Sequence, residues 1–136
     1  MKTKTLDLIG TALDWAVARA KNIPAEEIYI SGRGKYQSLF RRQRDEDGNL
    51  DGAYMTGPDL LFSSKWEAGG PILTEARISR TIDHSGLWVA YWTDGYGEED
   101  FYKKWMHCDR SELVAGLRCF VASKLGDEVD IPEELT

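Results

Sequence analysis

The sequence has little cysteine and little histidine, with two of each among 136 residues. Two thiols do not make the disulfide framework of a small secreted domain, so Cys108 and Cys119 are predicted to be free thiols in a reducing compartment. Zinc sites need several Cys or His ligands at set spacings, and no second pair accompanies His107 and Cys108. We therefore expect no disulfide, no metal site and no cofactor.

Long apolar runs are also lacking. No stretch approaches the roughly 18 apolar residues of a membrane-spanning helix, and the first ten residues hold no apolar stretch of signal-peptide length. Positive charge is outweighed, because the formal net charge is −6. A field of that sign repels phosphate backbones, which argues against broad nucleic-acid binding. The sequence predicts a cytoplasmic protein with neither a membrane nor a general nucleic-acid partner.

The chain does have enough length and apolar content for one folded domain over residues 1–136. Near its start, Thr11 and Asp14 form a capping-box pattern ahead of apolar residues at helical spacing. This pattern predicts a helix over residues 11–24, limited at its far end by Pro24. A β-rich run at 26–30 predicts a short strand after it.

The middle of the chain predicts a second helix and a hairpin. Residues 63–76 favour a short helix capped by Ser63 or Ser64 and kinked or restarted at the glycine pair that precedes Pro71. The runs 76–82 and 87–93 predict two strands joined by a turn at "DHSG", and 101–107 predicts a third strand after a turn at "DGYGEED".

The last helix is predicted from a capping-box-like start at Asp109 and Glu112 and from a glycine at its end, Gly126. One apolar stripe runs along it, formed by Leu113, Val114, Leu117, Phe120, Val121 and Leu125. The whole pattern predicts an α+β domain. In it, an antiparallel sheet of about three to five strands is layered with an N-terminal and a C-terminal helix, in the manner of an α-β-α sandwich.

The stretch "SGRGKYQSLFRRQR", residues 31–44, places five cations and two glycines in an otherwise acidic chain. It does not match a Walker A loop, because Gly32 and Gly34 are too close together and Tyr36 replaces Ser or Thr. Two interpretations stay open: a solvated basic strand or loop, and an edge that binds an anion or a partner. The arginines at 41–44 are expected to be neutralised by the "DEDG" that follows.

If the stretch is a binding edge, its cations would hold phosphate or carboxylate and Tyr36 would stack on a ring or contact a partner. The tryptophan and glycine pair of the second helix are added as possible neighbours. The predicted binding residues are Arg33, Lys35, Tyr36, Trp66, Gly69 and Gly70.

Other chemistry has weaker support in the sequence. An Asp83-His84 pair in a hairpin turn could orient an imidazole for base catalysis with nearby carboxylates, but no Ser or Cys nucleophile is linked to it.

Aromatic residues are concentrated between Trp88 and Trp105, and they form either core, an aromatic pocket or an interface. Because two helices cannot cover all of them, we expect self-association as a homodimer.

Three stretches, "TALDWAVARA", "WEAGGPIL" and "GLRCFVASKLGDEVDIP", resemble the NinX-like family of small proteins from temperate phages and prophages of enteric bacteria. Where that family carries S-T-D-W, this sequence has Ser63-Ser64-Lys65-Trp66, with a cation in place of a carboxylate. The resemblance implies phage origin and no established reaction.

In that setting we expect a non-enzymatic phage accessory protein in the host cytoplasm. It would bind a host component as a counter-defence inhibitor acting on a host protein. One alternative is a protein that sequesters a nucleotide-like small molecule. A further alternative is a small hydrolase that uses His84 and carboxylates.

Overall fold

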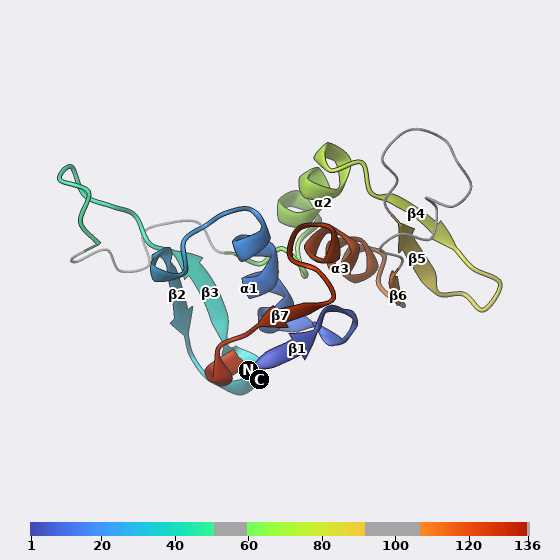
Figure 1. Cartoon of the computed structure of the whole chain (residues 1–136), viewed down its shortest axis with the longest axis horizontal. Coiled ribbons are helices and arrows are strands. Elements are labelled where there is room, and N and C mark those ends of the chain that lie inside the picture. The colour runs from blue at the N-terminus through green and yellow to red at the C-terminus, as the bar shows by residue number, and fades with distance from the viewer. Residues whose placement is uncertain (51–59, 92–106, 136) are drawn as a thin grey trace.

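Figure 1 shows the computed structural model of the chain, which describes residues 1–50, 60–91 and 107–135. The helices are α1 (Gly10–Ala20), α2 (Trp66–Glu75) and α3 (Glu112–Leu125). The strands are β1 (Lys2–Lys4), β2 (Ile28–Ser31), β3 (Ser38–Arg41), β4 (Ser79–Ile82), β5 (Trp88–Tyr91), β6 (His107–Asp109) and β7 (Glu128–Asp130). The predicted α+β class is confirmed.

The strands pair antiparallel in separate small sheets. In the part of the chain that is described, β1 pairs with β7, β2 with β3, and β4, β5 and β6 form a three-stranded sheet. The predicted hairpin is confirmed, with Ser79 opposite Tyr91 and Ile82 opposite Trp88. The structure thus divides the strands among small sheets, where the sequence had suggested one sheet layered between two helices.

Helix α3 lies at the centre of the molecule, between the other two helices and the three-stranded sheet (Figure 1). Its residues 113–122 are all buried, so the helix is enclosed around its circumference and not only along the predicted stripe. Burial on all faces places this part of the helix in the core. Leu125, which was counted in the stripe, is 38% exposed and lies beyond the buried part.

The start of α3 differs from the prediction by two residues. Ser111 is the N-cap, and its Oγ accepts a hydrogen bond from the Val114 backbone N–H at 3.2 Å. Asp109 instead accepts a hydrogen bond from the Ser111 N–H at 2.8 Å, which fixes the residue that caps the helix. The predicted end is confirmed, because Gly126 follows the last helical residue with φ +88°.

The capping box predicted for α1 is wrong. Ile9 occupies the N-cap position without a side-chain hydrogen bond, and Thr11 donates to Gln37 Oε1 at 3.0 Å. Asp14 is buried and accepts a hydrogen bond from the Ser63 N–H at 2.7 Å. The helix ends at Ala20, earlier than Pro24, through a Schellman turn that has Asn22 at φ +65°.

Helix α2 runs without a break through the glycine pair and Pro71. The capping role predicted for Ser63 or Ser64 is wrong, since Lys65 is the N-cap and makes no side-chain cap hydrogen bond. Gly69 lets the backbone of α2 come close to its neighbours at this point. A Cβ there would lie 2.3 Å from the Phe62 carbonyl oxygen and 2.8 Å from Leu113 Cδ1. The glycine therefore lets α2 pack directly on the preceding segment and on α3.

Several sequence predictions fall partly outside the described residues. The turn at "DGYGEED" and residues 101–106 of the predicted third strand lie there, as do the aromatic residues from 92 to 105. Of the aromatic group, Trp88 packs against the core beside Ala90, which is fully buried. No helix in the described ranges is long and apolar enough to cross a membrane.

Cys119 lies inside α3 and is fully buried, and burial raises the pKa of its thiol to about 12. Because the thiolate is the reactive form, almost none is present at neutral pH. In a Cys108→Ser variant, Cys119 is the remaining thiol, and we expect iodoacetamide to label it only after denaturant is added. Mass spectrometry of the labelled protein checks this, and complete labelling within minutes in native buffer would contradict the placement of α3.

Candidate functional site

The basic stretch 31–44 forms the turn and second strand of the β2–β3 hairpin. Residues 34–36 make one turn of 3-10 helix, in which Tyr36 and Gln37 donate backbone hydrogen bonds to Arg33 and Gly34. Gly32 has φ +79°, and a Cβ there would lie 2.5 Å from the Tyr36 carbonyl oxygen. The turn that joins the two strands therefore requires glycine at this position.

Four of the five cations in the stretch fall into two groups, of which the first is paired, while the guanidinium of Arg42 lies 5.4 Å from the centroid of the Tyr29 ring. Arg41 contacts Glu27 with N–O distances of 3.2 and 3.3 Å, and Arg44 contacts the same carboxylate at 3.4 Å. Glu27 is buried, so its charge needs these partners. The predicted neutralisation by the carboxylates of "DEDG" is wrong for the described residues, because the ion pairs of Arg41 and Arg44 are with Glu26 and Glu27 and Arg44 meets that turn at the Gly48 carbonyl, 2.8 Å from Nη1.

The second group is Arg33 and Lys35, which with Gly34 and Tyr36 form what we call the basic loop, residues 33–36. Both cations are exposed, and neither has a carboxylate within ion-pair distance among the described residues. The Lys35 ammonium lies 5.2 Å from the centroid of the Tyr36 ring, and Tyr36 is 77% exposed. The loop thus presents uncompensated positive charge beside an exposed aromatic ring.

A groove of about 330 Å³ runs from the basic loop to the start of α1. Its lining includes Lys35, Thr11 and Asp14, and the pair Ser63–Ser64 that precedes α2. Gln37 holds the loop in place, because it accepts from Thr11 and donates to the Glu134 carbonyl at 2.7 Å. The groove therefore joins the loop to two segments that are distant from it in the sequence.

The other predicted binding residues do not line this groove. Trp66 is half-exposed, and the guanidinium of Arg80 lies 6.0 Å from the centroid of its ring. Gly69 is buried against Phe62 and Leu113, and Gly70 packs beside Trp66. The structure thus brings Lys35 and Tyr36 together and assigns Gly69 to packing, while the role of all six residues in binding stays a prediction.

His84 is exposed in the hairpin turn, and its neighbour Asp83 is engaged with the turn itself. Asp83 Oδ1 accepts hydrogen bonds from the Ser85 hydroxyl at 2.6 Å and from the Leu87 N–H at 3.0 Å. The Ser85 hydroxyl first, and then the Leu87 N–H, hold the pKa of Asp83 below its ordinary value. This carboxylate stabilises the turn, and no hydrogen bond joins it to the imidazole in the described part of the chain.

Sequence reasoning missed a buried arginine. Arg118 on α3 donates from Nε to the Leu8 carbonyl at 2.8 Å and from Nη1 to Asp109 at 3.2 Å. It ties α3 to the segment before α1 and to the end of β6. A cation in the middle of the apolar part of the helix, residues 113–122, was the available signal, since such a residue is rarely buried without partners.

Comparison with known proteins places this arrangement in a family. A search of curated proteins finds no match. A family model described as "Bacteriophage P22, NinX" matches residues 4–124, a range that contains α1, the basic loop, α2 and almost all of α3. The match extends well beyond the three stretches that carry the resemblance in the sequence. The chain therefore belongs to the NinX family of phage proteins.

Proposed function

We propose that this protein is a non-enzymatic phage accessory protein that binds an acidic surface of a host protein through its basic loop, and so blunts a host defence. The observation that carries the proposal is the division of the cations in residues 31–44. Arg41 and Arg44 are neutralised by Glu26 and Glu27, whereas Arg33 and Lys35 have no such partner among the described residues. Two uncompensated positive charges are thus close together at one exposed turn.

An acidic protein surface suits the chemistry of this loop. Arginine forms paired hydrogen bonds with carboxylates, and lysine adds a compact charge. Tyrosine and arginine are enriched at protein interfaces, and an exposed tyrosine contributes a large contact area. Because the loop is held by Gln37 and by the required glycine at 32, its side chains are presented from a fixed backbone.

A nucleotide-like small molecule is the second candidate, since the groove beside Lys35 is lined by the hydroxyls of Thr11, Ser63 and Ser64. These hydroxyls are already used within the protein, since Thr11 donates to Gln37, Ser63 to the Gly10 carbonyl and Ser64 to the Leu61 carbonyl. Their engagement favours the protein partner over the nucleotide. The hydrolase alternative has less support, because Asp83 is committed to its turn.

The test is a pull-down from host lysate with the wild type and with the double variant Arg33→Glu/Lys35→Glu. We expect the captured host protein to be lost with the variant, because a charge-assisted contact contributes about 1.5–3 kcal/mol and reversal replaces it with repulsion. Stability should change by no more than about 0.5 kcal/mol per exposed site. Mass spectrometry identifies bound proteins and any released nucleotide, and wild-type binding should weaken as salt rises.

A control with the same change in net charge is Lys2→Glu/Lys4→Glu, which alters exposed cations on β1. It should capture the partner as the wild type does. Capture by the Arg33→Glu/Lys35→Glu variant at wild-type level would refute the basic loop as the binding surface. Release of a nucleotide without a protein partner would favour the second candidate, and turnover of that nucleotide would favour the hydrolase.

A further inference from the structure

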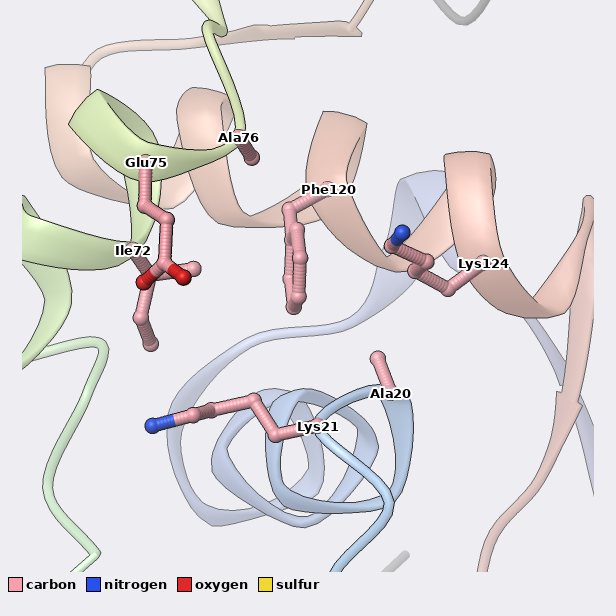
Figure 2. A pocket seen from close by; sticks show the side chains of 7 residues that line it. All are labelled: Ala20, Lys21, Ile72, Glu75, Ala76, Phe120 and Lys124. Atoms are coloured by element: carbon pink, nitrogen blue, oxygen red, sulfur yellow. The ribbon is translucent and has the colours of Figure 1, made fainter.

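The three helices end around one hollow, which is separate from the basic loop. Figure 2 shows it between the last turns of α1, α2 and α3. We call it the helix-end pocket, and its lining residues are Ala20, Lys21, Ile72, Glu75, Ala76, Phe120 and Lys124. Its volume is about 350 Å³, which falls within the range of about 300–1,000 Å³ typical of small-molecule sites.

The pocket has an apolar floor and a charged rim. Ala20, Ile72 and Phe120 are only 5–6% exposed, and the Phe120 ring stands between α3 and α1 (Figure 2). The rim carries the ammonium groups of Lys21 and Lys124 and the carboxylate of Glu75. None of the three has an ion-pair partner in the described ranges, and the Lys21 ammonium lies 5.4 Å from the centroid of the Phe62 ring, which is outside the pocket lining.

We propose that the helix-end pocket binds a small amphipathic organic anion. The aromatic or aliphatic body would cover Phe120 and Ile72, and the carboxylate would lie near the Lys124 ammonium, which is beside Phe120 (Figure 2). Apolar lining with a few charged groups that fix orientation is typical of such sites. This inference is independent of the proposed function, because the pocket shares no residue with the basic loop or its groove.

A purely structural role for the lysines is the competing explanation. The C-terminal end of a helix carries partial negative charge, and Lys21 and Lys124 lie where a cation offsets that charge. Glu75 distinguishes the two explanations. If the pocket binds an anion, the Glu75 carboxylate opposes binding and its removal strengthens it. If the lysines serve only the helix ends, removal of Glu75 changes no ligand affinity.

The experiment is a titration followed by heteronuclear NMR, with naphthoate as the anionic probe and naphthylmethanol as its neutral counterpart. We expect naphthoate to shift the backbone signals of the lining residues and to bind more tightly than the alcohol. Its affinity should fall as salt rises, because the rim is exposed to solvent. Equal affinity for both probes, or shifts confined to other parts of the chain, would overturn the proposal.

Two single variants and two matched controls complete the test. Lys124→Gln should weaken naphthoate binding about two- to five-fold, and Glu75→Gln should strengthen it about two- to five-fold, as expected for exposed charges. Glu67→Gln, on the exposed first turn of α2, and Lys35→Gln, in the basic loop, should leave it unchanged. An unchanged affinity in Glu75→Gln would overturn the proposal. The Lys35→Gln control keeps this outcome distinct from any failure of the host-protein proposal.

Discussion

Leu117→Ala should lower the free energy of unfolding by about 2–5 kcal/mol, the range for a buried leucine whose loss leaves a cavity. Leu117 is fully buried in the middle of α3, which contacts both other helices and the three-stranded sheet. Few neighbouring segments can move inward to fill the space, because the helix is enclosed on every side. Urea unfolding followed by tryptophan fluorescence measures the change.

Leu125→Ala is the matched control on the same helix. Leu125 is 38% exposed, so its side chain buries less apolar surface than the side chain of Leu117. The substitution should therefore lower the free energy of unfolding by well under half as much as Leu117→Ala does. Equal losses in the two variants would mean that α3 is not buried as described. A urea midpoint of unfolding for Leu117→Ala that equals the wild-type midpoint would lead to the same conclusion.

Gly69→Ala should lower the free energy of unfolding by about 3 kcal/mol, at the upper end of the usual overpacking range. The added methyl group would lie 2.3 Å from the Phe62 carbonyl oxygen and 2.8 Å from Leu113 Cδ1. The first of these atoms belongs to the backbone, so relief requires α2 to move away from the segment before it. Thermal melts of the variant and the wild type give the difference.

Gly70→Ala separates packing from helix propensity, because it makes the same substitution at the next position of the same helix. A methyl group there would lie 3.0 Å from the Trp66 ring, which is half-exposed and can shift. Replacing glycine in a helix with alanine gains up to about 1 kcal/mol, so this variant should be nearly neutral or stabilising. A stable Gly69→Ala protein would show that α2 does not approach Phe62 closely.

The sequence predicted those elements whose signals are local. The β4–β5 hairpin follows from two β-rich runs around a turn in which Asp83 binds the backbone, and α3 follows from its apolar residues and Gly126. Helix caps were harder, because several polar residues compete for each position. Asp14 fitted a capping box by spacing, yet it is the acceptor for Ser63, a partner that no local pattern identifies.

Long-range pairing was not predictable in the same way. β1 and β7 each span three residues and have no β-rich pattern, so only their contact with each other makes them strands. The arrangement of α3 between the sheet and two helices likewise depends on packing across the whole chain. Self-association as a homodimer stays a prediction.

The candidate site was predicted in part. Alternating cations and Tyr36 indicated the basic loop, but the partner of Arg41 and Arg44 is Glu27, which precedes β2 and meets them only through the hairpin register. The helix-end pocket had no sequence signal, since its residues come from three helices and each looks ordinary in its own segment.

The pairing of β1 with β7 has a consequence for the order of folding. Thr3 lies opposite Val129, so this sheet closes a loop that contains nearly the whole chain (Figure 1). The entropy lost in closing a loop grows with the length of the loop. Three residue pairs contribute too little free energy to offset this loss until the core has brought the two ends of the chain together. We expect the two hairpins and the helices to assemble first. The short β1–β7 sheet should form last, after the rest of the molecule has reached its native topology, and should then hold the two ends of the chain together.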